Sequence, residues 1–134
     1  MFGPTPRDYD TRLPKKIRQK ALISALSLKN KQSEITVIED IQLSEPKTKH
    51  LVKMMSVLHL DKSRNLCVVS SVDEKLKRAH QNLKEVFSIK RADDLNAYHL
   101  LRRKHLVITK SALPIIEKRA LETDDNKAKE LVTA

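Results

Sequence analysis

Residues 66–69, Leu-Cys-Val-Val, form an uninterrupted apolar run, and no other stretch of the sequence constrains the fold as strongly. Such a run is typical of a strand that is buried on both faces, as the strands of a parallel sheet are. Three further β-rich runs occupy residues 35–41, 86–89 and 106–109. Because segments with helical spacing of apolar residues separate them, we expect βαβ units and a parallel sheet covered on both sides.

Serine residues mark the expected starts of three helices in this α/β pattern. Ser44 is expected to cap the helix after the first strand, because its hydroxyl can accept a hydrogen bond from an unpaired backbone N–H. Ser71 and Glu74 form a capping-box pattern that opens the next helix. A short helix is expected over residues 96–103, and Ser111 is expected to cap the last one. A helix is therefore expected after every strand.

The first expected helix begins near Pro14 and changes character along its length. Pro14 suits the first turn, because the N–H that it lacks would have no partner there. Residues 21–28 are apolar almost all the way round, so this part of the helix is expected to be covered on most sides. Lys15 and Lys16 lie at the positive end of the helix dipole, where each cation costs about 0.3–1 kcal/mol. We therefore expect an anion nearby.

The basic charge of the chain is concentrated at its amino end. The 134 residues include 27 Lys and Arg against 17 Asp and Glu, a net charge of +10. This balance favours a polyanionic partner, either nucleic acid or an acidic membrane surface. Residues 1–31 hold eight basic side chains against two acidic ones, and aromatic residues make up 3% of the chain. Phosphate contacts are therefore favoured over base stacking, and the alternative is an ordinary solvated lysine face.

Scarce residue types exclude several classes of site. Gly3 is the only glycine, which excludes a glycine-rich phosphate loop, a dinucleotide fingerprint and a nucleophile elbow. Cys67 is the only cysteine, so a disulfide framework is excluded, and we expect a small buried hydrophobe rather than a nucleophile. The five histidines lack metal-ligand spacing, and Ser70, Asp93 and Asp94 belong to no catalytic constellation. No catalytic residue, metal or cofactor is expected.

Five groups of residues carry a resemblance to a known family. The first is the run Phe-Gly-Pro-Thr-Pro-Arg-Asp-Tyr, which opens the chain at residues 2–9. The others lie at residues 13–27, 45–49, 92–98 and 106–113. In order and spacing, from the second residue to about residue 121, the chain resembles the family of large-subunit ribosomal protein four, of bacterial or organellar type.

The resemblance implies an α/β, Rossmann-like three-layer domain, in which helices cover a mainly parallel sheet of about four short strands. We expect this domain to span residues 1–121, and residues 122–134 to form a polar tail that is either a helical extension or disordered. The implied partners are large-subunit ribosomal RNA and neighbouring large-subunit ribosomal proteins, with no small-molecule substrate. The implied location is the large ribosomal subunit, in a bacterial cytoplasm or a mitochondrial matrix. No membrane partner is expected, because no apolar stretch approaches about eighteen residues.

Positions that match the family's motifs imply the side chains that face RNA. They are Arg7, Arg12, Lys15, Lys16 and Arg18 in the amino-terminal segment, and Lys47, Lys49 and Lys110 further along the chain. Lys110 lies between an expected strand and an expected helix, a junction that is suited to anions. Ile23 and Gln81 stand where the family often has arginine, which removes two phosphate contacts.

In the family, an earlier stretch supplies a first strand and helix and then a long basic loop that reaches the peptide exit tunnel. This sequence begins where that loop returns to the globular body, so we expect the loop and the preceding element to be absent. One edge of the sheet should then be exposed, which favours aggregation unless RNA or a partner covers it. Two other hypotheses stay open: a small α/β nucleotide-binding enzyme that uses the ends of its strands, and a free RNA-binding regulator outside the ribosome.

Overall fold

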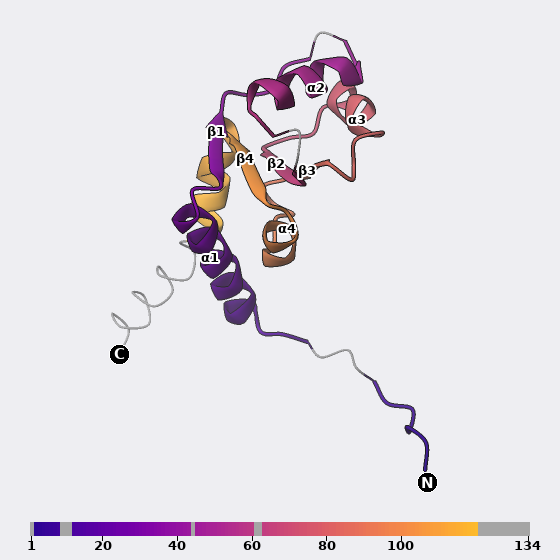
Figure 1. Ribbon diagram of the computed structural model, residues 1–134. Coiled ribbons are helices and arrows are strands. Elements are labelled where there is room, and N and C mark those ends of the chain that lie inside the picture. The colour runs from indigo at the N-terminus through magenta and orange to yellow at the C-terminus, as the bar shows by residue number, and fades with distance from the viewer. Residues whose placement is uncertain (1, 9–11, 44, 61–62, 121–134) are drawn as a thin grey trace, which may run out of the picture.

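The computed structural model describes residues 2–8, 12–43, 45–60 and 63–120 (Figure 1). In chain order, its elements are α1 (Lys15–Lys31), β1 (Ile35–Ile38), α2 (Thr48–Val57), β2 (Asn65–Val69), α3 (Glu74–His80), β3 (Phe87–Arg91), α4 (Ala97–Arg102), β4 (His105–Thr109) and the 3₁₀ turn η1 (Lys110–Ala112). A further helix covers residues 113–120. Each expected strand is present, although β1 ends at Ile38 and not at residue 41.

The described strands form one parallel sheet in the order β1-β4-β2-β3. β2 and β4 occupy the centre, and Asn65 at the start of β2 pairs with Phe87 of β3 and His105 of β4. Every residue of β2 is buried, so the apolar run at 66–69 correctly predicted a strand that is covered on both faces.

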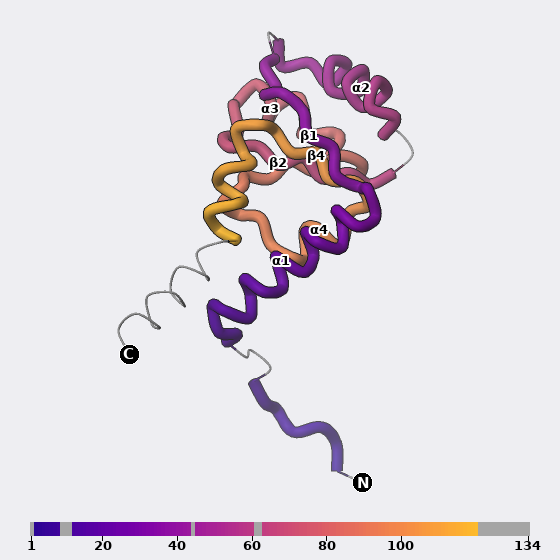
Figure 2. The backbone as a smooth tube through the Cα atoms, turned by 90° about the vertical axis from the view of Figure 1, so that its left-hand side faces the viewer, coloured from indigo at the N-terminus to yellow at the C-terminus, as the bar shows by residue number. Residues whose placement is uncertain are grey.

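Alternate residues of β2 belong to two separate cores, because the side chains of a strand point to opposite faces in turn. Leu66 and Val68 pack with residues of α1, α4 and the helix 113–120. Cys67 and Val69 pack with residues of α2 and α3. Figures 1 and 2 show the pair α1 and α4 at one side of the sheet and the pair α2 and α3 at the other. The predicted three-layer α/β fold is therefore confirmed.

α1 buries one side, contrary to the cover on most sides expected for residues 21–28. Its buried residues are Leu22, Ala25 and Lys29, which the helical period places on one face. Leu28, in the same apolar stretch, is 43% exposed. Within the described chain, the sheet and α4 approach α1 from one direction, so apolar composition alone overstated how much of this helix would be covered.

Two of the expected helix starts lie too early in the chain. α2 begins at Thr48, after a residue with an extended backbone and no side-chain cap; Ser44 itself lies outside the described residues. α3 begins at Glu74, with Asp73 as its N-cap residue, so Ser71 and Glu74 do not form the expected capping box. A capping hydroxyl must reach the second or third N–H of its helix, and in α3 these belong to residues beyond Glu74.

Ser111 does not cap the last helix but lies within η1. Its hydroxyl donates to Asp40 Oδ1 at 2.5 Å, and its backbone N–H points to the same oxygen at 3.3 Å. The Ser111 Oγ also lies 2.9 Å from the hydroxyl of Ser70, which follows β2. The carboxylate that accepts from this turn therefore comes from the segment after β1, a contact between distant parts of the chain that a local cap pattern does not reveal.

Asn96 provides a side-chain cap for α4, since its Oδ1 accepts the backbone N–H of His99 at 3.0 Å. We expect Asn96→Ala to lower the free energy of unfolding by about 1 kcal/mol, because that N–H loses its partner. Asn96→Asp should keep most of the stability, and Asn82→Ala, in an exposed turn, serves as the control. Urea unfolding would measure all three, and equal midpoints for Asn96→Ala and the unchanged chain would contradict the prediction.

Residues 121–134 lie outside the described residues, so the expected domain boundary and the expected form of the tail stay predictions. Among the described helices, none has the length and apolar character that crossing a membrane requires.

Candidate nucleic-acid interface

Side chains from three parts of the chain surround a cavity of about 340 Å³ beside the amino-terminal half of α1. We call it the cationic pocket, and its lining residues are Lys15, Arg18, Gln19, Leu22, Leu95, Asn96 and Arg119. The first four belong to α1, the next two to the turn before α4, and the last to the helix 113–120. The pocket therefore lies where α1 extends beyond the sheet.

Helical spacing explains why α1 presents these residues together. Arg18 and Gln19 are three and four residues after Lys15 and four and three residues before Leu22, so all four share one face of the helix. The same face continues into the buried positions of α1 and packs on the sheet. α1 thus has one face that changes from cationic to apolar along its length, and the cationic part begins where the core ends.

The charges in the cationic pocket are not balanced within the described chain. Its lining contains three cations, two amide side chains and no carboxylate. The first turn of α1 has no acidic residue, and Pro14 provides no side-chain cap, so Lys15 lies at the positive end of the helix dipole as expected. Arg119 donates from Nη1 to the carbonyl oxygen of Ala92, which holds its guanidinium in place. Such a group of donors suits a phosphate.

Comparison with known proteins assigns the family. Residues 1–119 match the model of the ribosomal protein L4/L1 family. This chain belongs to that family.

Bacterial members of the L4/L1 family are similar to this chain over most of its length. Large ribosomal subunit protein uL4 of Oceanobacillus iheyensis is 42% identical over 112 residues, which are 84% of this chain and 53% of the relative. The protein of the same name from Desulforamulus reducens is 42% identical over 117 residues, or 87% of this chain and 55% of the relative. The uL4 of Amoebophilus asiaticus is 37% identical over 113 residues. The chain spans about half the length of these L4/L1 relatives.

The structure places two of the residues implied by the L4/L1 resemblance, Lys15 and Arg18, in the cationic pocket. Lys16 is exposed on the next face of α1, and Arg7 and Arg12 lie in the exposed segments before the helix. Sequence reasoning did not select Gln19, Asn96 and Arg119. Helical spacing from Lys15 would have been a sufficient signal for Gln19. No local pattern connects α1 with Arg119, which is near the other end of the chain.

The other implied residues lie away from the pocket, and two of them, Lys47 and Lys110, have acidic partners. Lys47 Nζ lies 2.6 Å from Glu45 Oε2, and both side chains are mostly exposed. Figures 1 and 2 show α2, which contains Lys49, at the opposite end of the molecule from the start of α1. Lys110 Nζ lies 3.2 Å from Glu39 Oε1, beside the junction where the Asp40 carboxylate already accepts from Ser111. The structure thus does not bring these lysines together with the pocket.

Lys29 is one of the eight basic residues near the amino end, yet it is only 5% exposed. Its ammonium group donates to Glu34 Oε2 at 2.6 Å and to the carbonyl oxygen of Lys104 at 2.8 Å. The hydrogen bond from Lys29 lowers the pKa of Glu34 below its ordinary value. Lys29 therefore joins the end of α1 to the starts of β1 and β4. Its charge stabilises the fold and is not presented to a ligand.

The carboxyl ends of β2 and β4 enclose only a small polar crevice. Asp40, Ser70, Thr109 and Ser111 are among the residues that line its volume of about 170 Å³. Small-molecule sites commonly have 300–1,000 Å³, and this crevice is below that range. A neighbouring hollow of about 490 Å³ is lined by Glu39, Asp40, Gln42 and Lys110, and its two carboxylates would repel the phosphates of a nucleotide. Cys67 is fully buried in the core, which confirms its assignment as a buried hydrophobe, and this burial raises the pKa of its thiol to about 12. Within the described ranges, no three His, Cys, Asp or Glu side chains form a metal-binding group.

Proposed function

We propose that this chain is a structural component of the large ribosomal subunit and binds ribosomal RNA through the cationic pocket. Its membership of the L4/L1 family supports the ribosomal role, because its relatives are named as proteins of the large subunit. The observation that carries the RNA contact is the convergence of Lys15, Arg18 and Arg119 around one cavity with no lining carboxylate. A phosphate in that cavity would offset the repulsion among the three cations.

α1 and the helix 113–120 contribute differently to such a contact. Arg119 is held by the Ala92 carbonyl, so it loses little freedom when an anion arrives. Lys15 and Arg18 lie on an exposed helix turn and can close over the phosphate from the other side. Each charge-assisted hydrogen bond contributes about 1.5–3 kcal/mol. Because these contacts engage the RNA backbone, they position the protein without reading bases, and binding should weaken steeply with salt.

The implied residues outside the pocket fall into two groups in this proposal. Arg7, Arg12 and Lys16 would extend the cationic surface along the RNA from the start of α1. Lys47, Lys49 and Lys110 would make separate and weaker contacts, since two of them already have carboxylate partners. We infer neighbouring large-subunit proteins as further partners, in a bacterial cytoplasm or a mitochondrial matrix. The small crevice at the strand ends favours no second, enzymatic function.

Sucrose-gradient fractionation of cells that express the tagged chain tests this function. We expect the chain to co-sediment with large subunits and to leave them when the salt concentration is raised, because salt competes for the phosphates. Treatment with ribonuclease before centrifugation provides the control. Recovery in the light fractions alone would contradict the ribosomal role and would favour the free RNA-binding regulator.

A further inference from the structure

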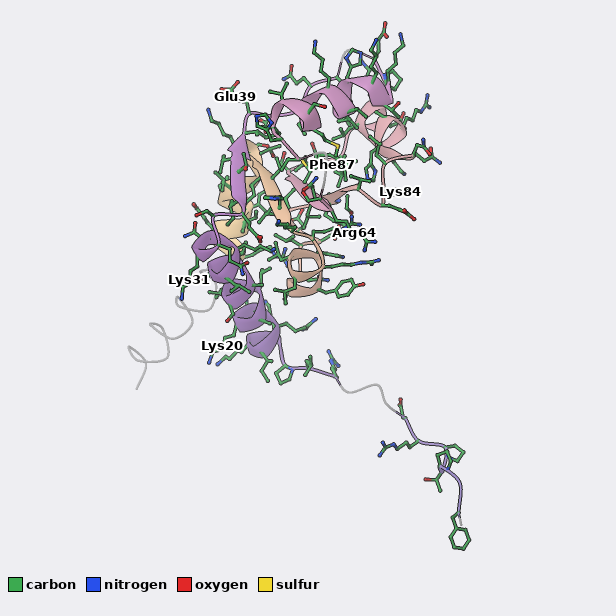
Figure 3. The ribbon with its side chains drawn as sticks, viewed as in Figure 1. Lys20, Lys31, Glu39, Arg64, Lys84 and Phe87 are labelled. Carbon is green, nitrogen blue, oxygen red and sulfur yellow. The ribbon has the colours of Figure 1, made fainter. Side chains whose placement is uncertain are left out.

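A second group of cations lies where the strands of the sheet begin, next to the end of α4. We call this end of the sheet its amino edge. Parallel strands all begin at one edge of a sheet, so residues that precede different strands become neighbours there. Arg64 precedes β2, Lys84 lies in the turn before β3, and Arg103 lies between α4 and β4. Figure 3 shows Arg64 and Lys84 at the right of the molecule, between α3 and α4. The topology thus concentrates charges that are far apart in the sequence.

Hydrogen bonds fix the relative positions of these segments. Arg103 donates from Nη2 to the carbonyl oxygen of Lys84 at 3.1 Å, and from Nη1 to the carbonyl oxygen of Glu85. The backbone N–H of Lys104 donates to the carbonyl oxygen of Arg64 at 2.8 Å. Arg103 therefore uses its donors to hold the turn before β3, and its charge stays at this edge.

Cationic repulsion at this edge is not relieved by ion pairs with described residues. Arg64, Lys84, Arg102 and Arg103 form no salt bridge within the described ranges. Burial lowers the pKa of Arg103 below its ordinary value, and the charges of Arg102 and Arg64 lower it further, whereas Glu85 acts in the opposite direction. An anionic partner would relieve this repulsion.

An exposed aromatic ring lies beside these cations. Tyr98 of α4 is 61% exposed, and Arg102, one helical turn later, lies with its guanidinium carbon 5.7 Å from the ring centroid. Arg102 also donates from Nη1 to the Tyr98 hydroxyl at 2.9 Å. These contacts orient the ring, while its exposure leaves surface for a ligand. Together with Arg64, Lys84 and Arg103, these two residues make up what we call the amino-edge surface.

We propose that the amino-edge surface binds a single-stranded segment of RNA, with one base stacked on Tyr98 and its phosphates on Arg64, Lys84 and Arg102. Exposed aromatic rings beside cations are the usual platform for unpaired bases, whereas the paired bases of a duplex are not free to stack on a side chain. An acidic peptide would satisfy the cations but would make no use of the ring. The proposal rests on the proposed RNA-binding function and adds a contact of another kind, away from the cationic pocket.

Fluorescence anisotropy with the full chain and two labelled RNAs tests the proposal. The probes are a 12-nucleotide oligouridine and a 12-base-pair RNA duplex. We expect Tyr98→Leu to weaken oligouridine binding roughly 10-fold and to leave duplex binding unchanged, because only the single strand presents a free base. Tyr98→Phe keeps the ring and should bind oligouridine almost as well as the unchanged chain. Circular dichroism melts verify that both variants fold alike.

Each outcome separates this surface from the cationic pocket. Equal oligouridine binding by Tyr98→Leu and the unchanged chain would overturn the proposal, as would an equal loss for both RNAs or no oligouridine binding at all. Lys15→Gln/Arg18→Gln should weaken both RNAs, because the pocket contacts phosphates. If that double variant binds both RNAs normally while Tyr98→Leu loses the single strand, the pocket assignment fails and the amino-edge surface stands.

Discussion

Replacing Lys15 and Arg18 by glutamate is expected to weaken binding to large-subunit ribosomal RNA by at least about 100-fold. Two charge-assisted hydrogen bonds of about 1.5–3 kcal/mol each would be lost, and the introduced carboxylates would repel the phosphate. Arg119 stays unchanged in this variant, because its bond to the Ala92 carbonyl supports the fold. Filter binding at several salt concentrations would measure the affinity.

A control with the same change in net charge separates the cationic pocket from the overall charge of the chain. Lys20→Glu/Lys31→Glu alters the same helix, and Figure 3 shows both lysines on the side of α1 away from α4. We expect this control to lose much less affinity. Equal losses of RNA affinity in the two double variants would show that net charge alone drives binding. They would contradict the assignment of the cationic pocket as the RNA contact.

Salt dependence offers a second readout of the same variants. Each lost phosphate contact should reduce the slope of log affinity against log salt by about 0.7–0.9. The neutral variant Lys15→Gln/Arg18→Gln should therefore bind with a slope that is lower by about 1.4–1.8, since two contacts are removed. An unchanged slope would mean that neither side chain touches a phosphate.

Lys29→Met is expected to lower the free energy of unfolding by about 3 kcal/mol. The change would leave two acceptors without their donor, the partly buried Glu34 carboxylate and the Lys104 carbonyl, at a cost of about 1–3 kcal/mol each. The methionine can fill most of the space of the lysine stem, so the loss reports the polar contacts. Urea unfolding would measure it, with Lys31→Met on the exposed side of the same helix as the control.

The pH dependence of stability provides an independent test of this pair. The hydrogen bond from Lys29 lowers the folded-state pKa of Glu34 below its ordinary value of 4.5. The pair between Lys29 and Glu34 therefore contributes its full share of the free energy of unfolding above about pH 4.5. This share is lost as the pH falls through the lower, folded-state pKa of Glu34. Lys29→Met should remove this part of the acid dependence. An acid limb identical to that of the unchanged chain would contradict the assigned role of Glu34.

Local patterns predicted most of the fold and the starts of α1 and α4, but not the starts of α2 and α3. The apolar run at 66–69 and the alternation of strands and helices correctly predicted a parallel sheet with two covered faces. Ser71 and Ser111 were wrong as caps, because the helix after β2 starts later and Ser111 bonds to Asp40 from another segment. A cap pattern describes a few neighbouring residues, so it does not detect a carboxylate supplied from elsewhere.

In the candidate sites too, local patterns identified some residues and missed those that are supplied by distant segments. Cationic residues near the amino end could be selected from the sequence, but Arg119 and Asn96 could not. Lys29 carried the same signal as its neighbours and proved to be buried, since its position on α1 shares the face of Leu22 and Ala25. Helical spacing holds this information, but the choice between faces depends on where the sheet lies.

The sequence by itself determined the parallel α/β architecture and the basic character of the start of α1, because side-chain period and charge are local properties. Only the tertiary structure decided which side of α1 is covered, which cations meet around the pocket, and that Arg64, Lys84 and Arg103 become neighbours at one edge of the sheet. Contacts of this kind join residues that are distant in the chain. They depend on the order of the strands and the docking of the helices, which follow from packing of the whole core.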